Sequence, residues 1–165
     1  MSVIFAIDPG PVESAYCVID RSGRPLDFDI APNYHVGRIL RATAVDRYII
    51  EWITSYGMTP GQDVFHTCRW IGRFEQIVLN QHEGRPAELI PRREVKLHHC
   101  GNSTAKDKNV TAALVERFAP GMGNFGKGTK DEPGWFHGFK TDVWQAYALA
   151  IAALDKGRQY HDGTS

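Results

Sequence analysis

Runs of apolar residues closed by glycine, proline or polar residues divide the chain into short strands. Residues 3–8 read Val-Ile-Phe-Ala-Ile-Asp and are followed by Pro9 and Gly10, a pattern that predicts a strand buried on both faces. Further strands are expected over residues 15–20, 25–30, 47–53 and 87–91. Apolar and polar side chains alternate in residues 25–30. One face of this strand is therefore solvated, and we expect it at an edge of the sheet.

Apolar residues spaced three and four positions apart predict the helices. They are expected over residues 36–46, 64–82, 104–118 and 141–156. Asp63 is well placed as the N-cap of the second helix. Residues 119–140 contain six glycines and two prolines, which predicts a long loop. No repeat or linker interrupts the pattern, so we expect one domain over residues 1–156 and a frayed C-terminal tail over residues 157–165.

The order of these elements predicts an α/β fold. An antiparallel hairpin ribbon is followed by alternating strands and helices, which indicates a mixed sheet with helices on both faces. A chain of 165 residues is long enough to bury such a core without disulfides or structural metals.

Composition narrows the functional classes only slightly. The chain has 19 basic and 19 acidic residues, so any anionic partner must meet a local positive patch. Three cysteines without CxxC spacing argue against a disulfide framework and a structural zinc site. There is no apolar run of membrane-spanning length and no signal sequence. We therefore expect a soluble, cytoplasmic protein with no membrane partner.

Three acids stand where candidate chemistry is expected. Asp8 ends the first strand, Glu51 lies within an apolar strand, and Asp142 opens the last helix. Burying an unpaired carboxylate is costly, which favours metal ligation at the carboxyl edge of a sheet. Each acid also has an ordinary structural explanation, because Asp before Pro-Gly suits a turn and an acid in the first helical turn suits the helix dipole. It is their combination that favours a shared site.

In these residues the chain resembles the RuvC-like Holliday-junction resolvases of the ribonuclease H-like fold. The likeness looks closest to a phage and prophage branch. The segments that carry it are residues 6–15, 50–58, 65–74, 93–101, 105–109 and 142–146. The Ile-Asp-Pro-Gly segment also resembles the phosphate loop of actin-like ATPases and sugar kinases, but those enzymes need two such domains around one nucleotide.

The resemblance implies a metal-dependent endodeoxyribonuclease that cleaves four-way junctions in DNA recombination and repair. Asp8, Glu51 and Asp142 would be its catalytic residues and would hold two Mg²⁺ or Mn²⁺ ions, with Asp8 bridging them. Well-known bacterial members carry a second acid or histidine three residues after the first in the last helix. Here that position is Gln145. Two roles stay open for it: a ligand through its carbonyl oxygen, or a neighbour that contacts the ligands. His137 is an alternative ligand. A shifted alignment would place Trp144 and Tyr147 at the ligand positions, which is chemically poor.

Branched DNA is the partner that the resemblance implies, bound by a homodimer that nicks two symmetric strands. Positive side chains near the expected site are candidates for phosphate contacts. These are Arg92, Arg93, Lys96, Lys106 and Lys108, with Arg69 and Arg73 as further candidates on the second helix. Two alternatives stay open: a ribonuclease H-like nuclease acting on other branched DNA or on hybrids, and a non-catalytic protein that binds branched DNA.

Overall fold

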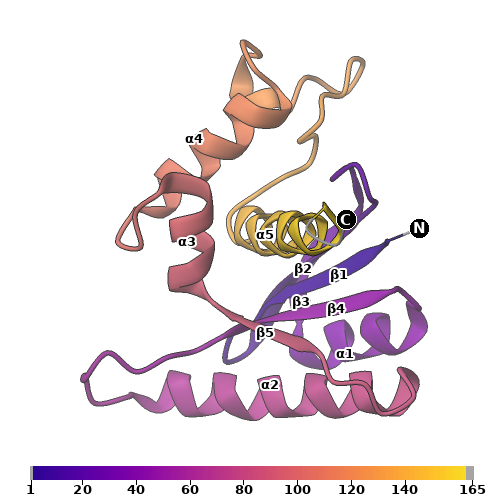
Figure 1. The fold of residues 1–165 in the computed structure, drawn as a ribbon, viewed down its shortest axis with the longest axis vertical. Coiled ribbons are helices and arrows are strands. Elements are labelled where there is room, and N and C mark those ends of the chain that lie inside the picture. The colour runs from indigo at the N-terminus through magenta and orange to yellow at the C-terminus, as the bar shows by residue number, and fades with distance from the viewer. Residues whose placement is uncertain (1, 163–165) are drawn as a thin grey trace.

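A five-stranded mixed sheet forms the centre of the molecule in the computed structural model, which describes residues 2–162. Its strands are β1 (Ile4–Asp8), β2 (Glu13–Ile19), β3 (Pro25–Pro32), β4 (Arg47–Trp52) and β5 (Glu88–Pro91). The spatial order is β3-β2-β1-β4-β5, with β3 at one edge as expected. The pairs β1–β2 and β2–β3 are antiparallel, whereas β1–β4 and β4–β5 are parallel. This arrangement confirms the predicted α/β fold with a mixed sheet (Figure 1).

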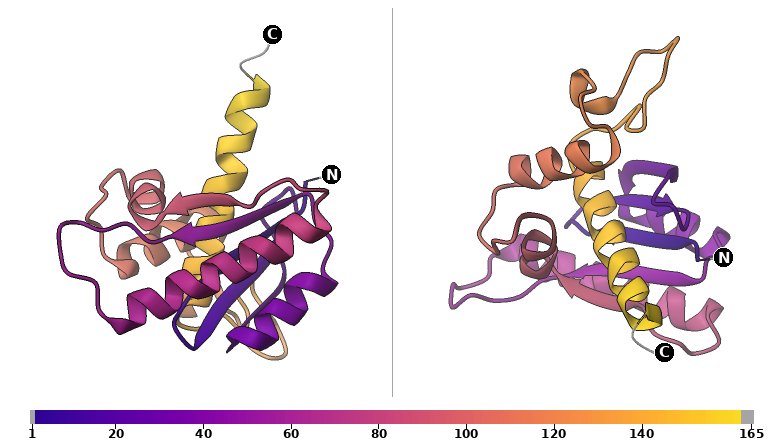
Figure 2. Two further views of the ribbon diagram at one scale, coloured as in Figure 1. Left: turned by 90° about the horizontal axis from the view of Figure 1, so that it is seen from below. Right: turned by 45° about the horizontal axis from the view of Figure 1, so that its top comes forward.

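Helices cover both faces of the sheet. They are α1 (Asn33–Ala42), α2 (Gln62–Gln81), α3 (Arg92–Cys100), α4 (Asp107–Phe118) and α5 (Val143–Asp162), with a 3₁₀ turn η1 at Asn124–Gly126. Helix α5 crosses one face, and α1 and α2 lie against the other (Figure 1). Helices α3 and α4 pack beside α5, at the end of the sheet where β5 leads into α3 (Figures 1 and 2).

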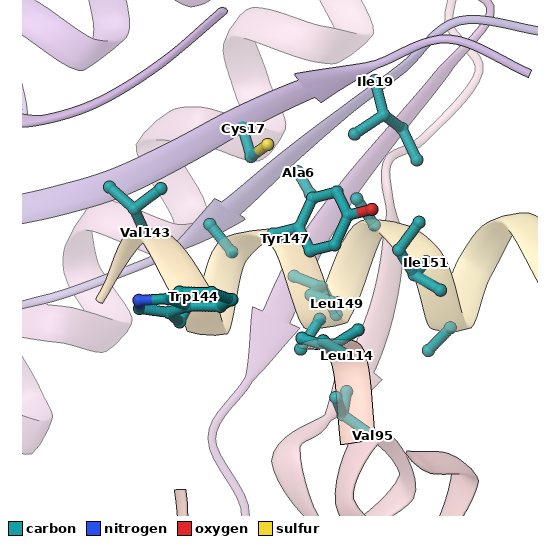
Figure 3. Packing of buried hydrophobic residues seen from close by; sticks show 14 of the residues in the cluster. Ala6, Cys17, Ile19, Val95, Leu114, Val143, Trp144, Tyr147, Leu149 and Ile151 are labelled. Atoms are coloured by element: carbon teal, nitrogen blue, oxygen red, sulfur yellow. The ribbon is translucent and has the colours of Figure 1, made fainter. Parts of the chain in front are cut away.

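The strands are buried on both faces because alternate residues enter two separate cores. Ile4, Ala6 and Ile49 pack against α5, whereas Phe5 and Ile50 pack against α1 and α2. The alanine-rich face of α5 allows close approach to the sheet, and larger side chains fill the space around it (Figure 3). One of them, Tyr147, donates a hydrogen bond of 2.8 Å to the carbonyl of Gly23. This contact fixes α5 against the turn between β2 and β3.

Several expected boundaries were wrong. Helix α3 was not predicted, because Val95 is its only fully buried residue and the segment lacks an apolar stripe. Gly101, which ends it with a φ of +66°, was the available signal. Helix α1 begins at Asn33 rather than at Val36. Asp63 is not the N-cap of α2, because the helix begins at Gln62, two residues before its expected start, and Gly61 is the N-cap.

The last helix is longer than the sequence pattern indicated. Helix α5 continues to Asp162, so residues 157–162 are helical where a frayed tail was expected. The remaining three residues of that predicted tail, 163–165, lie outside the described residues. The residues that follow Leu154 read Asp-Lys-Gly-Arg and lack the apolar spacing from which a helix can be predicted. Across the part of the chain that the structure describes, no helix combines the length and hydropathy needed to cross a membrane.

Candidate active site

The parallel pairing of β1 and β4 brings Asp8 and Glu51 together. Ile7 is paired with Ile50, so the next residues along the two strands are Asp8 and Glu51. Paired residues of parallel strands point to the same face, and here that face is the one covered by α5. The two carboxyl groups are near enough for each to affect the pKa of the other. The sequence-based expectation that these two acids meet at the carboxyl edge of the sheet is therefore realised in the geometry.

The electrostatics of the pair are those of two acids removed from water. Burial raises the pKa of Asp8 well above its ordinary value, and the negative charge of Glu51 raises it further. Burial also raises the pKa of Glu51, while the guanidinium of Arg92 acts in the opposite direction. A positive partner is favoured here, because burial disfavours the ionised form of both carboxyl groups and the charge of Glu51 disfavours it further at Asp8.

Arg92 is the positive side chain closest to this pair. It is the first residue of α3 and follows β5, the neighbour of β4. Its Nη1 lies 3.3 Å from both carboxylate oxygens of Glu51, and its Nη2 donates a hydrogen bond of 2.8 Å to Oδ1 of Asp107. Arg92 was expected to contact DNA phosphates; in this structure its guanidinium contacts two acids. Asp107 was missed, because it lies between Lys106 and Lys108 and the segment was interpreted only as basic.

A hydrogen-bond network fixes the turn that follows Asp8. The side chain of Asn33 donates a hydrogen bond of 2.8 Å to the carbonyl of Gly10, and the hydroxyl of Ser14 accepts one of 3.1 Å from the Gly10 amide. The Ser14 hydroxyl also donates to Oδ1 of Asn33. Both side chains are buried. They were not predicted, because Asn33 comes from α1 and only the fold brings it beside this turn.

The third predicted acid, Asp142, lies just before α5. Its backbone carbonyl accepts hydrogen bonds from the amides of Gln145 and Ala146, which places Asp142 immediately before the helix. The residue is exposed, whereas an inward-facing position was expected. Its charge is still near enough to raise the pKa of Asp8. Asp142 as a third ligand stays a prediction.

The other residues considered as ligands in the last helix differ in their environments. Gln145 is buried in the first turn of α5, and its role also stays a prediction. Trp144 and Tyr147 belong to the core against the sheet, which argues against the shifted alignment (Figure 3). His137 is exposed, and its Nδ1 lies 3.3 Å from the carbonyl oxygen of Lys127.

The residues present fit a hard divalent cation in a specific way. Mg²⁺ is commonly held by one or two carboxylates, with waters and substrate phosphate oxygens completing the coordination. Asp8 and Glu51 supply two such carboxylates in a desolvated position. Within residues 2–162, no group of three or more His, Cys, Asp or Glu side chains is arranged to hold a metal ion. The site therefore offers a pair of ligands rather than a closed protein cage.

The predicted DNA-binding residues divide into two sets. Arg92, Arg93 and Lys96 line a recess of about 310 Å³ together with Tyr56, Ser103 and Thr104. Lys106 and Lys108 are exposed at the start of α4, on either side of Asp107. These residues adjoin the carboxylate pair through the Arg92–Asp107 contact.

Arg69 and Arg73 lie elsewhere. Both are exposed on α2, which covers the sheet face opposite to α5. The guanidinium of Arg73 lies 4.5 Å from the ring centroid of Trp70. The fold does not bring these two arginines to the carboxylate pair.

Comparison with known proteins gives a clear result for the fold. No family model and no curated protein matches the chain. Among solved structures, the chain is similar to Thermus thermophilus RuvC, with a TM-score of 0.68, 15% identity and 96% coverage of both chains. It is also similar to T. thermophilus RuvC in complex with a Holliday junction substrate, with a TM-score of 0.63, 14% identity and 96% coverage of both chains.

These similarities confirm the RuvC-like, ribonuclease H-like fold inferred from the sequence. At 14–15% identity they establish the fold alone. The expected phage and prophage branch stays a prediction, as does the homodimer.

Proposed function

We propose that this protein is a metal-dependent endonuclease that cleaves branched DNA, with four-way junctions as its substrate. One observation carries the proposal: Asp8 and Glu51 lie near the carboxyl ends of neighbouring parallel strands as a desolvated carboxylate pair, and Arg92 connects the pair to a recess lined by basic side chains of α3. Two solved structures with the same fold support it, and one of them is described as a complex with a Holliday junction substrate.

The residues of the site suit phosphodiester hydrolysis. Asp8 and Glu51 would hold the divalent cations, Mg²⁺ or Mn²⁺, with Asp142 as the third ligand and Gln145 nearby. When bound, such ions activate a water molecule and neutralise the charge that develops on the phosphate. Because the attacking group would be water, no protein nucleophile would be needed.

Substrate would be held by basic residues next to the pair. The net charge of the chain is zero, so the positive charge must be local. It is supplied by Arg93, Lys96, Lys106 and Lys108. Contacts of this kind position the sugar-phosphate backbone and carry no sequence information. We infer that selection of branched DNA comes from the spacing of two such sites in a homodimer, one for each cleaved strand.

Cleavage of a labelled four-way junction tests the proposal. The junction is incubated with Mg²⁺ or Mn²⁺ beside a linear duplex, a fork and an RNA–DNA hybrid, using the native protein, Asp8→Asn and the surface variant Glu116→Gln. Paired nicks in the junction that are lost only in Asp8→Asn are the expected result. Cutting of all substrates at equal rates would indicate a less specific nuclease. Tight junction binding without cleavage by the native protein would identify a binding protein and contradict the proposal.

A further inference from the structure

Arg92 bridges two acids that differ in their exposure to water. Glu51 has 12% of its side-chain surface exposed, whereas Asp107 has 57%. Arg92 itself is 31% exposed, so its guanidinium extends from the buried carboxylate pair to the surface. A single side chain therefore connects the candidate metal ligand on β4 to an acid on α4.

The two contacts of Arg92 are unequal in geometry. Toward Glu51, one nitrogen lies 3.3 Å from both oxygens, which is longer than a strong charge-assisted hydrogen bond. Toward Asp107, the hydrogen bond is 2.8 Å long. The contact with Asp107 is thus the better hydrogen bond, while the contact with Glu51 mainly compensates a buried negative charge.

We propose that Arg92 competes with divalent cations for the Glu51 carboxylate, and that Asp107 keeps the guanidinium at the margin of the site when a cation binds. The inference rests on the proposed function, because it assumes that Glu51 is a metal ligand. Asp107 is then a positioning residue that acts through Arg92. The guanidinium of Arg92 spans the distance between Asp107 and Glu51. Lys96 lies 3.8 Å from Asp107 but does not connect Asp107 to Glu51.

When a cation replaces Arg92 at Glu51, the displaced guanidinium gains a function. Arg92 lines the recess that Arg93, Lys96 and Tyr56 share, so after leaving Glu51 it faces an open basic surface. A phosphodiester group entering that recess meets a guanidinium that is no longer neutralised by Glu51. Cation binding and phosphate binding therefore favour each other through one side chain.

Calorimetric titration with Mn²⁺ in the absence of DNA tests the competition. Arg92→Gln removes the competitor and should bind Mn²⁺ about three- to tenfold more tightly, a change of up to about 1.4 kcal/mol. Arg92→Lys keeps the charge without the planar fork and should show a smaller gain of the same sign. Lys96→Gln is the matched control, since it removes one positive charge from the same surface without a contact to Glu51, and its gain should be smaller than that of Arg92→Gln.

A double-mutant cycle tests the part of Asp107. In Asp107→Asn, the guanidinium of Arg92 keeps only its contact with Glu51, so it should compete more strongly and Mn²⁺ binding should weaken. The expected loss is about threefold, which is the contribution of a partly exposed ion pair. In the Arg92→Gln background the same substitution should have little effect. Thermal unfolding with and without Mn²⁺ provides a second readout, because tighter binding raises the midpoint further.

The outcomes separate this inference from the proposed function. Unchanged or weaker Mn²⁺ binding by both Arg92 variants overturns the competition, while Asp8-dependent Mn²⁺ binding by the native protein leaves the proposed function intact. An equal effect of Asp107→Asn in both backgrounds overturns the anchoring role and makes Asp107 a direct neighbour of the cation. Absence of Asp8-dependent Mn²⁺ binding in the native protein overturns both proposals.

Discussion

Asp8 and Glu51 lie side by side near the carboxyl ends of adjacent parallel strands, and each affects the pKa of the other. Burial disfavours the ionised form of both acids, and the negative charge of Glu51 adds to the cost of ionising Asp8, so Asp8 does not stabilise the fold as a carboxylate. Such a pair is expected where function, rather than stability, determines the residue types. The residues directly before the two acids, Ile7 and Ile50, are buried and apolar, which shows how localised the conflict is.

The Asp8→Asn variant should be more stable than the native protein at neutral pH. The pKa of Asp8 is raised in the folded state, so its favourable contribution is present below the ordinary pKa of aspartate and is lost as the pH rises through the raised value. The variant escapes that loss, and its free energy of unfolding should exceed the native value by about 1 kcal/mol or more at pH 8.

Thermal unfolding at pH 4 and pH 8, without divalent cations, measures this difference. It should shrink toward pH 4, where Asp8 is protonated in the native protein as well. Glu116→Gln, an exposed acid on α4, should show no comparable change. A variant less stable than the native protein at both pH values would contradict the assignment of Asp8 as a desolvated acid.

Asn33→Ala should weaken the site without removing a ligand. The substitution leaves the Gly10 carbonyl and the Ser14 hydroxyl without their buried partner, which should cost about 1–3 kcal/mol of unfolding free energy. Since this network fixes the turn after Asp8, Mn²⁺ affinity should also fall several-fold. Urea unfolding and calorimetry measure the two effects, with Asn80→Ala on α2 as the control. Unchanged Mn²⁺ affinity in a destabilised variant would mean that the turn does not position Asp8.

Asp155 should dominate the acid sensitivity of the contact between α3, α4 and α5. It accepts hydrogen bonds of 2.6 Å and 2.9 Å from Arg117 and one of 2.7 Å from His98, when that ring nitrogen carries the proton. Burial opposes ionisation of this carboxyl group, but these hydrogen bonds outweigh burial and lower its pKa. The stability it contributes is present above the ordinary pKa of aspartate and is lost as the pH falls through the lowered value.

Asp155→Asn should accordingly lose about 1–3 kcal/mol of unfolding free energy at pH 7, since Asp155 is only 15% exposed and its partners lose their counter-charge. The difference from the native protein should narrow as the pH is lowered toward 3 in urea-unfolding experiments. Asp131→Asn, in the exposed loop after η1, serves as the control. Equal losses at both pH values would point to packing rather than charge.

The salt dependence of junction binding should distinguish the two sets of basic residues. Replacing Lys106 and Lys108 together by Gln should lower the slope of log affinity against log salt by about 0.9 for each lost phosphate contact with duplex DNA. Replacing Arg69 and Arg73 should leave the slope unchanged, because α2 lies on the opposite face of the sheet. The measurement is fluorescence anisotropy over a range of salt concentrations. A larger effect of the α2 variants would place the DNA on that face.

Much of the architecture followed from local patterns. The five strands, the edge position of β3 and four of the five α-helices could be predicted, because buried strands and amphipathic helices leave a periodic signal. The exceptions have a common cause. Helix α3 fully buries only Val95, and the sequence after Leu154 is mostly charged and polar, so these segments resemble a loop and a tail.

The candidate site was predictable only in part. Asp8 and Glu51 stood out because each interrupts an apolar strand. The contacts of Arg92 with Glu51 and Asp107, and those of Asn33 with the turn after β1, join elements distant in the chain. Such contacts leave no periodic pattern in the sequence, and Arg92 was consequently interpreted as a phosphate-binding residue alone.

The amino-acid sequence by itself determined which segments become strands and which acids lie at their ends. The reason is that buried apolar side chains recur at every second residue of a strand and at every third or fourth residue of a helix, which is a local pattern. Only the tertiary structure decided the partners of those acids. The parallel register of β1 and β4 places two carboxylates together, and the start of α3 brings a guanidinium to them. Charge interactions depend on distance in space, and distance in space is set by how the whole sheet and its helices assemble.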